Sequence, residues 1–164
     1  MIGDSFTTGL PVKNKLNIHL ANYPSAKIDN VVKTVVYFSD KFDELNTVVV
    51  HTGANDIKYG RKTEELKDSF KILYERTQHL SKRLVISGPI PTKNCTCEHF
   101  SRICALNEWL GIWCKEKRID YVNNFKTDWS KLNLLNYYGT SLNMRGKQRL
   151  IKNIDYAINK KQSD

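Results

Sequence analysis

Short runs of apolar residues recur along the chain, and between them apolar residues repeat at every third or fourth position. The runs at 47–51, 83–87 and 119–123 are rich in β-branched side chains and predict strands, while residues 16–20 alternate at period two and predict another. A first strand is expected to end just before Gly3. A strand that is covered on both faces is continuously apolar, so these runs favour a parallel sheet.

Helical spacing predicts four helices in the intervening stretches. Residues 28–38 form the first, and Thr63, an oxygen cap ahead of acidic residues, opens the second. The third follows Glu98, and Asn143 caps the last. Strands that alternate with helices in this way predict right-handed βαβ units, and therefore an α/β fold around a five-stranded parallel sheet.

A length of 164 residues and a mass of 19.0 kDa suit one compact domain, which we expect to comprise residues 1–164. No run of about 18 apolar residues occurs, which excludes a membrane-spanning helix. No cleavable signal is visible, which favours an intracellular protein. Because a first strand normally has more residues before its turn, Met1 is expected to follow a missing part of that strand.

The net charge of +9 favours acidic partners such as nucleic acid or an anionic membrane surface. The basic residues are dispersed, however, and such dispersal is more typical of a solvated surface. They fall in separate segments of the chain, around 58–62, 115–118 and 145–152. Nothing in the pattern indicates an oligomeric state.

The cysteines are clustered within twenty residues, at Cys95, Cys97, Cys104 and Cys114. Their spacing, with His99 between them, differs from the paired C-x2-C arrangement of common zinc sites. We therefore expect no metal, and no motif predicts a cofactor. The three tryptophans, Trp109, Trp113 and Trp129, are expected to pack in or near the core.

Ser5 stands where the first strand gives way to a turn. A hydroxyl held there can be a nucleophile if a base accepts its proton and amide donors receive the oxyanion that develops. Ligands of parallel α/β sheets bind beyond the carboxyl ends of the strands. Several polar positions are therefore expected to gather at this edge, namely Ser5, Ser25, Asn55 and the loops 88–91 and 138–141.

Gly3-Asp4-Ser5 followed by Gly53-Ala54-Asn55-Asp56 resembles the SGNH (GDSL-type) hydrolases, which are esterases. Segments 48–56, 85–91 and 106–110 are particularly similar to the SGNH domains of vertebrate, especially fish, LINE-type retroelements. The resemblance implies a flavodoxin-like, three-layer α/β/α fold with strand order 2-1-3-4-5. It also implies that Ser5 is the nucleophile position, with an oxyanion hole built from the Ser5 amide, a glycine amide and the Asn55 side chain.

The rest of the family pattern matches less well. The family's oxyanion glycine falls on Ser25, whose backbone amide can still donate. The family's catalytic aspartate falls on Tyr138 and its histidine on Ser141, while Gly139, Asn143 and Gly146 keep the register. A serine does not accept a proton near neutral pH, and a tyrosine does not orient a base as a carboxylate does. The resemblance therefore implies a nucleophile position without its base.

A replacement base would have to be one of the four histidines of the chain, His19, His51, His79 or His99. His51 closes a buried strand and is more typical of a hydrogen-bonded core residue. His79 ends a helix and is expected to face solvent. Asp4 and the Asn55-Asp56 pair also have a structural interpretation, in which they fix the loops after their strands.

Three functions follow from the sequence. The first is a degenerate SGNH hydrolase-like domain, impaired or inactive, that serves as a retroelement-derived binding module for a small acyl ester or related ligand. The second is a weak serine esterase that acts on small acyl esters through Ser5 and Asn55. The third is a nucleic-acid-associated accessory module, motivated by the basic charge.

Overall fold

A computed structural model describes residues 1–11, 19–129 and 132–159. Its centre is a sheet of five parallel strands in the order β2-β1-β3-β4-β5, as predicted. The strands are β1 (Ile2–Gly3), β2 (Ala21–Asn22), β3 (Val48–His51), β4 (Leu84–Ser87) and β5 (Asp120–Val122).

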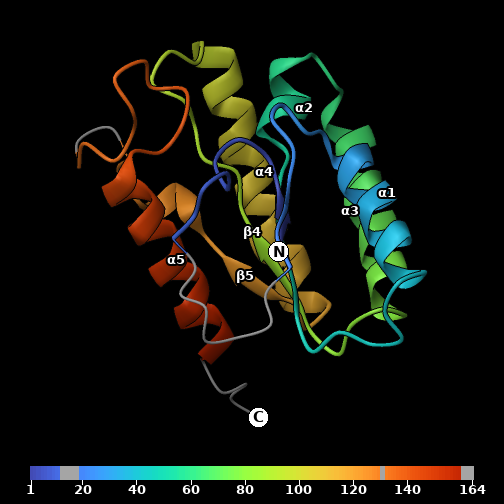
Figure 1. The fold of residues 1–164 in the computed structure, drawn as a ribbon. Coiled ribbons are helices and arrows are strands. Elements are labelled where there is room, and N and C mark those ends of the chain that lie inside the picture. Colours follow the sequence, from blue (N-terminus) through green and yellow to red (C-terminus); the bar gives the residue numbers. More distant parts are fainter. Residues whose placement is uncertain (12–18, 130–131, 160–164) are drawn as a thin grey trace.

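Helices cover both faces of this sheet, which gives the expected three layers (Figure 1). The helices are α1 (Ile28–Ser39), α2 (Ala54–Lys58), α3 (Thr63–Gln78), α4 (Cys97–Glu116) and α5 (Met144–Asn159), with a short 3-10 helix, η1, at Asn124–Lys126. α1, α3 and α4 pack on one face, and α5 packs on the other.

Alternation along the strands explains why the protein has a core on each side of the sheet. Val48 and Val50 of β3 face the core formed with α1, α3 and α4, whereas Val49 faces the core formed with α5. The tryptophans pack as expected: Trp109 and Trp113 stack with ring centroids 5.1 Å apart, and Trp129 is 2% exposed.

The prediction of a strand at 16–20 is wrong for its described part, and residues 16–18 lie outside the described residues. The strand begins at Ala21, because the Ala21 amide donates to the Met1 carbonyl at 2.9 Å. The Tyr23 amide likewise donates to the Gly3 carbonyl at 3.0 Å. Period-two alternation shows which residues can form a strand, but the backbone partners decide which do.

Two helix details also differ from the prediction. α2 was expected to be a loop, since its five residues are too few to show a helical repeat. Thr63 is the first residue of α3 rather than its cap; Lys62 takes the cap position, and no side chain caps the helix there. Asn143 does cap α5, since its side-chain oxygen accepts from the Gly146 amide at 3.0 Å.

Within the described ranges, no helix is long and apolar enough to cross a membrane.

Candidate functional site

Ser5 lies in the turn after β1, beyond the carboxyl end of that strand. Its geometry comes from Asp4, whose carboxylate accepts from the Phe6 amide at 3.0 Å and whose carbonyl accepts from the Thr7 amide at 3.0 Å. The Asn22 side chain donates to the Thr7 carbonyl at 3.0 Å and so ties β2 to the same turn. Ser5 itself is half-buried.

Asn55 and the loop around Ser25 form one corner of this edge. The Asn55 amide nitrogen donates to the Ala26 carbonyl at 3.0 Å, so the two predicted oxyanion elements are in contact. Ser25 has a φ of 60°, in the left-handed region where a side chain is disfavoured. A glycine would adopt this backbone without strain, and glycine is the residue that the resemblance implies at this position.

We expect Ser25→Gly to stabilise the fold by about 0.5–1 kcal/mol, because glycine adopts a left-handed backbone without the steric cost of a Cβ. Urea unfolding monitored by tryptophan fluorescence measures this change. Ser25→Ala is the matched control, since it removes the hydroxyl but keeps the Cβ. Equal stability of the two variants would show that the backbone at this position is unstrained.

Asp56 is fully buried beneath this corner and holds two elements together. One carboxylate oxygen accepts from the Ile28 amide at the start of α1 at 3.0 Å, and the other accepts from the Arg61 guanidinium at 3.1 Å. Burial raises the pKa of Asp56, and the Ile28 and Arg61 hydrogen bonds oppose that rise. Arg61 also bonds Asp29 at 2.9 Å and the Ser69 hydroxyl at 2.7 Å. Asp56 therefore fixes the helix that carries Asn55.

A row of buried polar side chains crosses the sheet below the Ser5 turn. The Nδ1 atom of His51 lies 3.0 Å from the Ser87 hydroxyl, which accepts from the Asn124 amide at 2.8 Å. The Nε2 atom of His51 lies 4.0 Å from the Asp4 carboxylate and has no hydrogen-bond partner among the described residues. Burial lowers the pKa of His51 and raises that of Asp4. The imidazole is thus a neutral core group, as its position in the strand suggested.

The loop before α5 carries Tyr138 and Ser141, the positions at which the resemblance implies an aspartate and a histidine. The Tyr138 side chain is 71% exposed and meets Tyr137 edge-on at 5.3 Å. Ser141 is half-buried, and its amide and carbonyl both bond Asn136. A tyrosine and a serine thus occupy a well-defined loop.

Gly139 and Gly146 fix the path of this loop. Gly139 has a φ of 68°, and its carbonyl accepts from the Lys93 amide at 2.9 Å, which docks the loop on the segment after β4. A Cβ on Gly146 would clash with the Leu134 carbonyl, so only glycine lets the start of α5 pack this closely against the backbone at Leu134.

The Ser5 hydroxyl makes no hydrogen bond to a histidine in the part of the chain that the structure describes. Among residues whose placement is described, no side chain is hydrogen-bonded to the Ser5 hydroxyl, and all four histidines are included. His51 bonds Ser87, exposed His79 caps the end of α3, the His99 amide bonds Thr96, and the His19 ring packs on Phe42 at 4.8 Å.

The cysteines are free, and the described residues contain no group of histidine, cysteine and acidic side chains that could hold a metal ion. Burial raises the pKa of Cys114 to about 12, which keeps this thiol protonated and unreactive.

Solved structures similar to this chain include hydrolases of one fold. The esterase domain of the ORF1 protein from the zebrafish ZfL2-1 retrotransposon is 32% identical over 96% of each chain, with a TM-score of 0.55. A lipolytic protein of the G-D-S-L family from Veillonella parvula has a TM-score of 0.82 at 14% identity, covering 98% of this chain and 97% of its own. A catalytic mutant of the acetylxylan esterase Axe2 from Geobacillus stearothermophilus has a TM-score of 0.71 at 14% identity, covering 99% and 95%.

Models of protein families gave no match to this chain, and neither did a search of curated proteins.

Proposed function

We propose that this chain, which belongs to the SGNH (GDSL-type) hydrolase family, is a hydrolase-like domain that binds a small acyl ester. It hydrolyses that ester far more slowly than an enzyme with a complete catalytic triad does. The observation that carries this proposal is the pair Tyr138 and Ser141 at the positions of the family's aspartate and histidine. The zebrafish relative supports an origin in a retroelement.

The chemical reason for impaired turnover is the proton on the Ser5 hydroxyl. A serine attacks an ester only when a base takes this proton during the attack. Loss of a triad base typically removes several orders of magnitude of rate and leaves what oxyanion donors and binding supply. The full burial of His51 and the 3.0 Å contact of its Nδ1 atom with the Ser87 hydroxyl argue against this role.

The chemical reason for retained binding is the set of oxyanion donors that the family resemblance implies, namely the Ser5 and Ser25 amides and the Asn55 side chain. The Asn55 amide nitrogen has two N–H groups, and its bond to Ala26 uses one of them. The other can donate to an ester carbonyl, together with the backbone amides of Ser5 and Ser25. These donors need no base, so a carbonyl ligand would still be held after catalysis is lost.

A fluorophosphonate probe tests the inactive half of the proposal, because it labels serines that a base has activated. We expect intact-mass analysis to detect no more adduct on the parent protein than on Ser5→Ala. Rapid stoichiometric labelling at Ser5 would instead support the second function, a weak esterase with an unrecognised base.

NMR titration with a short-chain ester tests the binding half. Shifts are expected at the amides of Ser5, Ser25 and Ala26, and Asn55→Ala should weaken binding. Asn94→Ala, an exposed asparagine in the loop before α4, is the matched control. Absence of these shifts, or an equal loss of affinity in Asn55→Ala and Asn94→Ala, would rule out binding at this corner.

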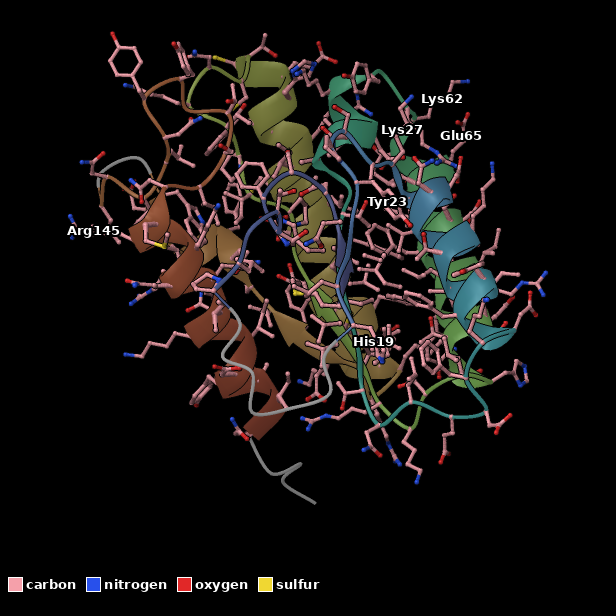
Figure 2. All side chains as sticks on the ribbon, viewed as in Figure 1. His19, Tyr23, Lys27, Lys62, Glu65 and Arg145 are labelled. Carbon is pink, nitrogen blue, oxygen red and sulfur yellow. The ribbon has the colours of Figure 1, made fainter. Side chains whose placement is uncertain are left out.

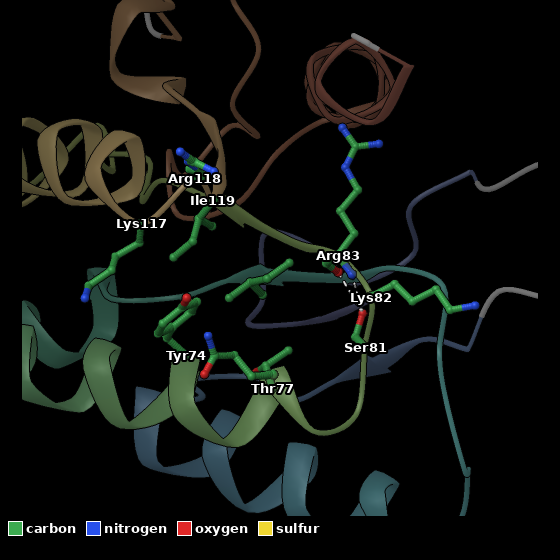
Figure 3. A pocket seen from close by; sticks show the side chains of 10 residues that line it. Tyr74, Thr77, Ser81, Lys82, Arg83, Lys117, Arg118 and Ile119 are labelled. Carbon is green, nitrogen blue, oxygen red and sulfur yellow. Dashed lines mark hydrogen bonds between the residues drawn. The ribbon is translucent and has the colours of Figure 1, made fainter. Parts of the chain in front are cut away.

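A second candidate function, association with nucleic acid, is favoured by a basic pocket at the opposite end of the sheet (Figure 3). Its volume is about 370 Å³, and cationic residues line it. Lys82 pairs with Glu44 at 2.9 Å and Arg83 with Asp120 at 2.6 Å. No acidic partner is found for Lys117 and Arg118 among the described residues, which leaves these two charges to meet a phosphate.

Single-stranded RNA binding measured at several salt concentrations tests this second candidate. Affinity should fall steeply with salt, and Lys117→Glu combined with Arg118→Glu should flatten that dependence. Arg145→Glu with Arg149→Glu, two exposed changes on α5, is the matched control for net charge. RNA binding that is independent of salt, or that both pairs of substitutions weaken equally, would exclude this pocket as an RNA-binding site.

A further inference from the structure

A pocket of about 290 Å³ adjoins the corner at which the Asn55 side chain contacts the Ser25 loop. The loop between Tyr23 and Lys27 forms one wall, and the first turns of α1 form the other (Figure 2). The loop contributes Tyr23, Ser25 and Ala26 to the lining, and α1 contributes Asn30, Lys33 and Thr34. Ser25 and Ala26 therefore belong both to this pocket and to the corner.

The polar side chains of this pocket mostly offer hydrogen-bond donors. The Asn30 side-chain oxygen already accepts from the Lys27 amide at 3.0 Å, whereas its NH2 group has no partner among the described residues. The Thr34 hydroxyl donates to the Asn30 carbonyl at 2.9 Å. No aspartate or glutamate of the described chain lines the pocket. The Asn30 NH2 group and the Lys33 ammonium group, which both only donate, are therefore the groups left for a ligand.

Lys33 gives this pocket a positive charge that is not neutralised. Its ammonium group has no acidic partner within the ranges that the structure describes. Asp29, in the first turn of α1, is bound to Arg61 at 2.9 Å. Lys27, at the end of the loop, adds a second cation, which lies 4.8 Å from the centroid of the Tyr59 ring. These charges and donors favour an anion.

We propose that this pocket binds a carboxylate or phosphate group of the ester whose carbonyl the Ser25 and Asn55 donors hold. The proposal rests on the proposed function and narrows its ligands to acyl esters that carry a negative charge. Ser25 connects the two sites, because its amide is the implied donor to the carbonyl and the same residue lines the pocket. Lys33 then selects the ligand through a compact, mobile charge that pairs with either type of anion.

Two esters that differ in charge test the anion site by NMR titration. Dimethyl succinate is uncharged, whereas monomethyl succinate carries one carboxylate beside the same ester group. Monomethyl succinate should bind at least about threefold more tightly, the gain that an exposed ion pair supplies. It should also shift the amides of Asn30, Lys33 and Thr34. Equal affinities of the two esters would overturn the proposal.

Lys33→Gln should remove the preference for monomethyl succinate and leave the affinity for dimethyl succinate unchanged. Lys41→Gln, at an exposed lysine just after α1, is the matched control for net charge and should keep the preference. A preference that survives Lys33→Gln would contradict the role of this lysine. An equal loss in both variants would contradict it as well, since it would reflect net charge alone.

Anions without an ester group separate this proposal from the proposed function. Succinate and inorganic phosphate should each shift the Asn30 and Lys33 amides, and Lys33→Gln should abolish these shifts. A comparison of the two shows which anion the pocket prefers. If neither ester shifts the Ser5 and Ser25 amides while succinate still shifts Asn30, the proposed function fails and the anion site stands. If neither anion shifts Asn30, the anion site fails, whatever the esters do.

Discussion

Tyr138→Asp combined with Ser141→His is expected to raise kcat/KM for a short-chain p-nitrophenyl ester by at least about 100-fold over the parent protein. A histidine at 141 would supply the missing proton acceptor, and an aspartate at 138 would orient it. Triad members act as a unit, so each single change should give little alone. The measurement is initial-rate kinetics of the parent, both single variants and the double variant.

The matched control keeps the same two residue types but moves the histidine by one position, as Tyr138→Asp with Thr140→His. This pair should show no gain, since Thr140 is exposed and precedes the position that the family uses. Adding Ser5→Ala to the active double variant should abolish the gain. If the double variant is folded but its kcat/KM does not increase, or if kcat/KM of the control increases as much, the assignment of Ser141 to the histidine position is wrong.

Asp56→Ala is expected to destabilise the fold by about 3 kcal/mol. The change leaves the Arg61 guanidinium without its buried partner and the Ile28 amide without an acceptor. Because Asp56 connects α2 to the start of α1, the substitution should also displace Asn55. Urea unfolding measures the loss of stability, and the amide shift of Asn55 reports the displacement.

Asp29→Ala removes the other carboxylate that bonds Arg61, and it is the control for Asp56→Ala. Asp29 is 62% exposed, so solvent screens its pairing with Arg61 and the loss should stay below about 1 kcal/mol. Equal losses in the two variants would show that burial of Asp56 adds nothing to the ion pair.

The strands, their order and the main helices could be predicted from the sequence because burial on both faces leaves a plain pattern. Val48-Val49-Val50 is apolar throughout, and the pairing of β3 and β4 confirms the parallel arrangement inferred from it. β2 could not be located in this way, since its two residues are defined by hydrogen bonds to Met1 and Gly3 rather than by their own pattern.

The residues that support the candidate site were not predicted. The family resemblance implies Ser5, Asn55 and Ser25 as site positions, and the fold brings Asn55 into contact with the Ser25 loop. The row from His51 to Ser87 and Asn124 was missed, because contacts across three elements leave no periodic signal in the chain. An asparagine just after a predicted strand is the only hint the sequence offers.

The most direct test of the central claim, that Ser5 lacks its base, compares the parent protein with Ser5→Ala on p-nitrophenyl acetate. A serine without a proton acceptor adds almost nothing to turnover, so we predict that kcat/KM of the two proteins agrees within about twofold. A parent value that exceeds that of Ser5→Ala by about tenfold or more would contradict the claim and show that Ser5 is an active nucleophile.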